Sequence, residues 1–116
     1  YVEYDVELDD NSLSVQCHNA NSFKVTIFEL DGFTVSFDGW HEEFDGLDDA
    51  LNCFVFGLII GCRLKVKKRG SFDCSWTLQS KDDGTWQDDS TTGMIFVPFW
   101  RTSYLEYRSN TLIERD

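Results

Sequence analysis

The stretch DGWHEEFDGLDD, residues 38–49, holds the densest group of side chains that could do chemistry. Carboxylates and a histidine bind metal ions or serve as acid and base groups when their spacing is right. An EF-hand loop needs an acid at position 1 and a glutamate at position 12, but aligning Gly46 to the central glycine puts His41 and Asn52 there. A zincin needs a second histidine where this chain has Asp45. The spacing therefore predicts no metal site.

The same stretch also suits the start of a helix. Asp45 is placed to cap it, and Asp48 and Asp49 fall in the first turn, where the helix dipole favours negative charge. Beyond these acids, a large aromatic side chain beside polar groups in a loop is typical of a binding site. We expect any ligand or partner site in this stretch to consist of Trp40, His41, Glu42 and Glu43.

Nucleophilic chemistry has little support. Cys17 and His18 are adjacent, so on a strand their side chains point to opposite faces. Cys53 could meet His41, but it sits in an apolar helical segment, where thiols are inert. With twenty-one acidic residues in the chain, the presence of two carboxylates is no evidence for glycoside hydrolysis. The chain has no GxSxG or glycine-rich phosphate motif. We find no catalytic motif and expect no cofactor, and the sequence leaves open whether the protein is an enzyme.

The run RLKVKKR, residues 63–69, holds five of the ten basic residues. A platform for single-stranded nucleic acid needs aromatic rings on the same face as the bases, whereas Phe72 and Trp76 have the opposite parity. We expect no nucleic-acid binding. If the strands are neighbours, the basic side chains pair with the acidic row Glu3, Asp5, Glu7 and Asp9, and otherwise they face solvent. Strand alternation places four of them in one basic row, Arg63, Lys65, Lys67 and Arg69.

The segment FVPFWRTSYLEY, residues 96–107, has enough large rings for an interface as well as a core. Tyr, Trp and Arg are the usual anchors of protein interfaces. We expect most of these rings in the core. A groove or a homodimer contact is the alternative for the residues around the strand break, Phe99, Trp100, Arg101 and Tyr104.

Alternating apolar residues predict strands over 1–10, 12–18, 22–30 and 33–37, with Asp31-Gly32 as a hairpin turn. A hairpin over 62–79, a short strand at Trp86, a polar loop over 88–93 and strands over 94–100 and 103–108 follow. The helix, over about 46–60, is apolar nearly all round and should be deeply buried. The predicted fold is α+β, a strongly curved antiparallel sheet of about seven to nine strands packed around or against this one helix.

At 116 residues the chain is expected to be a single domain, 1–116. Its longest apolar run, residues 53–60, is too short for a membrane span. Four cysteines without a CxxC pair favour free buried thiols and a cytoplasmic location, although two disulfides and a periplasmic or secreted location stay open. The start at Tyr1 fits a trimmed chain or a mature product without its signal peptide.

Two classes of function fit these observations. The net charge of −11 and the lack of catalytic motifs favour a non-enzymatic binding protein, of inhibitor or immunity type, whose acidic surface meets a basic protein partner. The alternative is a small-molecule or metal-binding protein or an enzyme, with a pocket near Trp40 and His41 and with Glu42 or Glu43 as the acid–base group. We expect the first.

Overall fold

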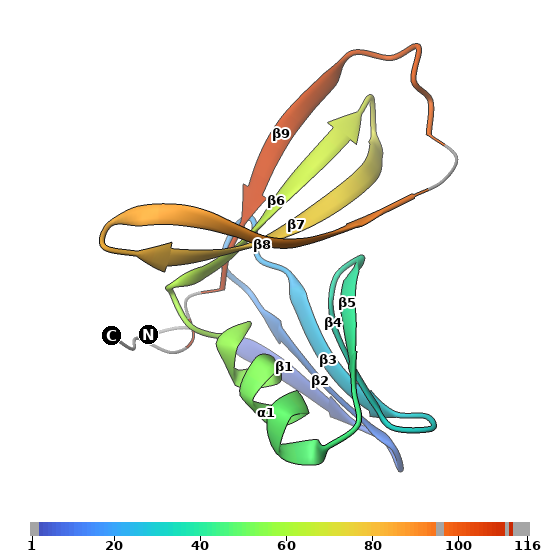
Figure 1. Ribbon diagram of the computed structural model, residues 1–116, viewed down its shortest axis with the longest axis vertical. Helices are drawn as coiled ribbons and strands as arrows, with labels where there is room; N and C mark the ends of the chain where they lie inside the picture. The colour runs from blue at the N-terminus through green and yellow to red at the C-terminus, as the bar shows by residue number, and fades with distance from the viewer. Residues whose placement is uncertain (1–2, 95–96, 111, 113–116) are drawn as a thin grey trace.

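The computed structural model describes residues 3–94, 97–110 and 112, and within them it confirms the α+β class with one helix near mid-chain (Figure 1). The nine strands divide between two antiparallel sheets instead of forming one, in the orders β1-β2-β3-β4-β5 and β8-β7-β6-β9. The elements are β1 (Tyr4–Leu8), β2 (Ser12–Cys17), β3 (Lys24–Glu29), β4 (Phe33–Phe37), β5 (Trp40–Phe44), α1 (Leu47–Phe56), β6 (Cys62–Arg69), β7 (Phe72–Asp82), β8 (Thr85–Gly93) and β9 (Ser103–Arg108).

Short hairpins build the first sheet. Asp31 and Gly32 join β3 to β4 with φ values of 51° and 116°, which confirms the predicted turn. Asp38, with φ 52°, forms a second Asp-Gly turn with Gly39, and this turn leads into β5, which starts at Trp40. Residues 40–44 therefore form an edge strand and not the predicted loop.

The helix starts differently from the prediction. Gly46 is the N-cap and no side chain caps the helix, so the expected capping role of Asp45 is wrong. Asp48 and Asp49 do lie in the first turn. The helix ends at Phe56, before the predicted boundary, and packs mainly on β3, β4 and β5.

The second sheet shows two errors of prediction. The expected polar loop over 88–93 belongs to β8, a long edge strand paired with β7. The expected strand over 94–100 is not a strand in its described residues, and residues 95–96 lie outside them. Pro98 accepts a hydrogen bond from the backbone N–H of Arg101 in a turn, where its missing N–H costs nothing.

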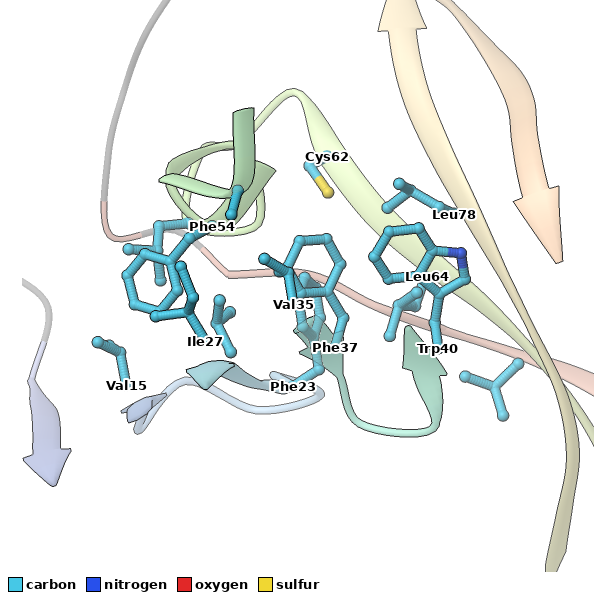
Figure 2. Close-up of a cluster of buried hydrophobic side chains, with 14 residues drawn as sticks. Val15, Phe23, Ile27, Val35, Phe37, Trp40, Phe54, Cys62, Leu64 and Leu78 are labelled. Carbon is cyan, nitrogen blue, oxygen red and sulfur yellow. The ribbon is translucent and has the colours of Figure 1, made fainter. Parts of the chain in front are cut away.

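One hydrophobic core joins the two sheets and the helix (Figure 2). Phe37 of β4 is fully buried and stacks on Trp40 at a centroid distance of 4.8 Å. Trp40 also donates from Nε1 to the Ser90 hydroxyl of β8 at 2.9 Å, which ties the sheets together. The buried cluster draws on β2 to β5, α1, β6 and β7, with Val15, Val35, Phe54, Leu64 and Leu78 among its members.

Candidate protein-interaction surfaces

The structure separates the four residues expected to form a site in the acidic stretch. Trp40 is 1% exposed and belongs to the core. Strand alternation turns His41 and Glu43 to the face opposite Trp40 and Glu42, and all three polar residues are exposed. The aromatic side chain that suggested a ligand site is therefore a packing residue, and the four side chains do not converge.

The thiols are suited to packing and not to catalysis. All four cysteines are free, and only Cys53 is not fully buried. Burial, with a smaller effect from the nearby Glu42 carboxylate, raises the pKa of the Cys53 thiol to about 12. Burial likewise raises the pKa of Cys17 and Cys62. A thiol with such a raised pKa is a poor nucleophile at neutral pH.

Two residues of the basic row make contacts with other residues of the second sheet. Arg63 lies between the rings of Trp86 and Tyr107, at 4.2 Å from each centroid, and Lys65 pairs with Asp88 at 3.1 Å. Hydrogen bonds from Gln79 and Lys65 lower the pKa of the Asp88 carboxyl.

The remaining members of the basic row differ from each other. Arg69 donates to the backbone carbonyls of Phe99 and Arg101, whereas Lys67 is exposed. The acidic row along β1 belongs to the other sheet, so the strands are not neighbours and the condition for pairing between the two rows is not met.

The predicted interface residues lie at the tip of the second sheet, where the chain crosses from β8 to β9 (Figure 1). Phe99 and Trp100 pack edge to face and are 75% and 73% exposed. Tyr104 is half exposed, and its hydroxyl donates to the Gly70 carbonyl at 2.8 Å. A hollow of about 810 Å³ lies between Phe72, Met94, Val97, Pro98, Phe99, Trp100 and Arg101.

Charge is divided sharply along the chain. Residues 1–60, which form the first sheet and α1, contain thirteen acidic residues and one basic residue. Residues 61–116 contain eight acidic and nine basic residues. The entire net charge thus resides on the first half, which we call the acidic half.

Within the described residues, few of these carboxylates form an ion pair with a cation. In the described part of the chain, Glu3 and Asp5 pair with His18, and Asp38 pairs with Arg108. The other ten acidic residues of the acidic half make no ion pair with a described residue.

A hollow of about 250 Å³ opens on the acidic half, between the first turns of α1 and the β1–β2 and β3–β4 turns. We call it the acidic groove. Its apolar walls include Leu8, Leu13 and Ile27 from the sheet, with Leu47 and Leu51 from the helix. Its rim carries the carboxylates of Asp9, Asp10 and Glu29. Neither Trp40 nor His41 lines it, so the pocket expected beside those two residues is not the one found here.

Sequence reasoning missed the acidic groove because its walls looked like core. Leu8 has the parity of the buried strand residues, and Leu47 and Leu51 have the spacing of an apolar helix face, but the three side chains are 78%, 47% and 39% exposed. The available signal was the cluster of turn acids, Asp9 and Asp10, directly after a strand with alternating apolar residues.

The fold and these surfaces define an acidic α+β domain that carries an apolar groove lined with carboxylates. Comparison of the chain with models of protein families, with curated proteins and with solved structures finds no match. No group of three His, Cys, Asp or Glu side chains that could hold a metal ion occurs among the described residues. Within the same residues, no helix is long and apolar enough to span a membrane.

Proposed function

We propose that this chain is a non-enzymatic protein-binding module whose acidic half recognises a basic partner protein. The observation that carries the proposal is the charge division: thirteen acidic residues and one basic residue in one half, with most carboxylates unpaired in the described chain. Folding gains nothing from such mutual repulsion, whereas a cationic partner converts it into attraction.

The acidic groove supports the proposal because it combines carboxylates with exposed apolar side chains. Carboxylates alone steer a partner and speed its association, but an interface also needs apolar contacts that exclude water. Exposed Leu8 and Leu51 beside the carboxylates of Asp9 and Asp10 supply both kinds of contact in one place.

Two matched double variants test the proposal. Asp9→Asn with Asp10→Asn removes two charges at the acidic groove, and Asp82→Asn with Asp83→Asn removes two charges at the β7–β8 turn. Each variant and the wild-type chain are immobilised and used to capture proteins from an extract of the source cell at low and high salt. We expect a partner of basic isoelectric point that is lost at high salt and lost by the groove variant, but retained by the turn variant.

The contrary results are equally clear. If the captured proteins are insensitive to salt, or if both variants lose them equally, the acidic groove is not the recognition surface. If the enriched proteins are acidic, the charge argument itself is wrong.

A further inference from the structure

The first sheet has one helix where its width has room for two. Five strands at a spacing of about 4.8 Å make a sheet about 24 Å wide, whereas a helix with its side chains is about 10–12 Å across. Because α1 lies mainly on β3, β4 and β5, no described element covers the inner face of β1, and of the inner residues of β2 only Leu13 is partly exposed. In Figure 2, Val15 of β2 is the outermost labelled side chain of the core, and β1 lies beyond it.

The uncovered part of the sheet is apolar on the side of the helix. Tyr4, Val6 and Leu8 lie opposite Cys17, Val15 and Leu13 of β2, so they share the face on which the core is built. Yet Tyr4 and Val6 are 50% and 53% exposed. We call this surface, which continues into the acidic groove, the open face; it comprises Tyr4, Val6, Leu8, Leu13, Leu47 and Leu51.

We propose that the open face is the docking site for a basic amphipathic helix of the partner protein, lying beside α1 over β1 and β2. This inference rests on the proposed function and adds the form of the partner segment. Packed helices lie about 8–10 Å apart, which is two strand spacings, so a helix packed against α1, which is centred on β4, would lie over β2 with β1 at its outer edge. Such a helix would extend the layer that α1 begins on this sheet.

The carboxylates near the open face require a partner helix with positive charge. Asp9, Asp10 and Glu29 stand at the end of the open face where it joins the acidic groove, and Asp48 is exposed in the first turn of α1. Lysine or arginine side chains flanking an apolar stripe would reach these carboxylates while the stripe covers the leucines. An acidic or uncharged helix would leave them unpaired and partly desolvated.

The length of the segment also follows from the sheet. Strands of five to six residues extend about 17–20 Å, a length that roughly 12 residues of helix match. Three turns present apolar side chains at positions i, i+4, i+7 and i+11. The partner segment is therefore a helix of about three turns with apolar residues at this spacing.

Designed peptides test the proposal without knowledge of the natural partner. The probe is an alanine-based helix of about 15 residues with a four-leucine stripe flanked by lysines. The matched peptides replace its lysines with glutamate, or alternate leucine and lysine so that a strand forms. Binding is followed by titration of the isotope-labelled protein, with amide shifts mapped by NMR and helicity of the peptide measured by circular dichroism.

Leu8→Gln and Leu51→Gln change exposed side chains of the open face, and Trp100→Gln is a matched change at the distant tip. We expect the lysine helix to bind on the open face and to be weakened about tenfold by either leucine substitution, because each removes buried apolar area without a change of charge. Trp100→Gln should leave the affinity unchanged, and the glutamate peptide should not bind.

Other outcomes overturn the proposal in distinguishable ways. Preference for the strand-forming peptide would indicate pairing with the free edge of β1. Concentration-dependent self-association lost in Leu51→Gln would make a second copy of this chain the occupant. Binding of the lysine helix that depends on Asp9 and Asp10 but not on Leu8 or Leu51 would retain the proposed function and remove the docked helix.

Discussion

Arg108 of β9 donates from Nη1 to Oδ2 of Asp38 at 2.9 Å, and this ion pair links the second sheet to the β4–β5 turn of the first. The Arg108 guanidinium also meets Asp73 at 3.0 Å and Glu106 at 2.7 Å. Burial opposes its charge, but the three carboxylates prevail and raise the pKa of Arg108. Arg108 thus lies among three carboxylates where the two sheets meet, and Lys68 also lies 3.5 Å from Asp73.

Replacing Arg108 with Met should destabilise the fold by about 3 kcal/mol, because the partly buried carboxylates of Asp38 and Glu106 would lose their cation and that of Asp73 would keep only Lys68. Lys67→Met, which removes an exposed charge from the neighbouring strand, should change the stability by less than about 0.5 kcal/mol. Urea denaturation of both variants measures the difference. Equal effects of the two substitutions would mean that the network contributes nothing specific.

Asn110 joins three segments that are distant in sequence. Its Oδ1 accepts from the backbone N–H of Phe23 at 3.2 Å, and its Nδ2 donates to the carbonyl of Gly57 at 2.9 Å. Because Asn110 is fully buried, Asn110→Ala should cost about 2–3 kcal/mol by leaving both backbone groups without a partner. Asn52→Ala, an exposed change on α1, should be neutral or slightly stabilising in the same unfolding experiment. A neutral Asn110→Ala would show that the C-terminal segment does not hold the helix end.

Gly57 follows the last residue of α1 and touches a ring. A Cβ on Gly57 would lie 2.5 Å from Cε1 of Phe37, so close contact with this side chain explains the glycine. Gly57→Ala should therefore destabilise by about 1–3 kcal/mol, although alanine normally favours a helix. Gly46→Ala, with no atom near its Cβ, provides the comparison.

A second substitution tests whether the Phe37 ring causes the loss of stability in Gly57→Ala. Phe37→Leu in the background of Gly57→Ala should restore part of the lost stability relative to the sum of the two single changes. Simple additivity in thermal unfolding would contradict a steric origin.

His18 fastens the edge strand β1. Its Nε2 lies 2.9 Å from Oδ2 of Asp5 and its Nδ1 lies 3.5 Å from Glu3, and the hydrogen bond to Asp5 is the main reason why the pKa of His18 is raised. A raised pKa in the folded state means that this stabilisation is fully present below the ordinary value of about 6.5 and is lost as the pH rises through the folded pKa.

His18→Gln should therefore lower the stability at about pH 5 and have little effect at about pH 9. NMR titration of the imidazole should give a pKa above about 6.5 that returns toward that value in Asp5→Asn. A stability difference that grows with pH would reverse the sign of this account.

Local signals predicted most of the elements. Alternation identified β1 to β4, and the Asp31-Gly32 pair identified a hairpin because those residues readily adopt positive φ. The Asp38-Gly39 pair is the same kind of hairpin signal, but the carboxylates around it are typical of a loop, so β5 was not predicted. The division of the strands between two sheets could not be predicted from the sequence, because it depends on long-range contacts such as the hydrogen bond from Trp40 to Ser90.

The interaction surface was harder to predict than the fold. Parity shows which face of a strand is apolar, but it does not show whether another layer covers that face. Tyr4 and Leu8 share the parity of core residues and remain exposed because α1 packs mainly on β3, β4 and β5. The acidic surface followed directly from composition, whereas the acidic groove required the position of the helix.

The salt dependence of partner affinity tests the central claim most directly. Raising the salt from about 0.1 M to about 1 M shortens the screening length from about 10 Å to about 3 Å. The account predicts that wild-type affinity for the captured partner falls steeply over this range, that Asp9→Asn with Asp10→Asn binds more weakly and less salt-dependently, and that Asp82→Asn with Asp83→Asn behaves as wild type. An affinity independent of salt, or the same salt dependence in all three proteins, would contradict recognition through the acidic half.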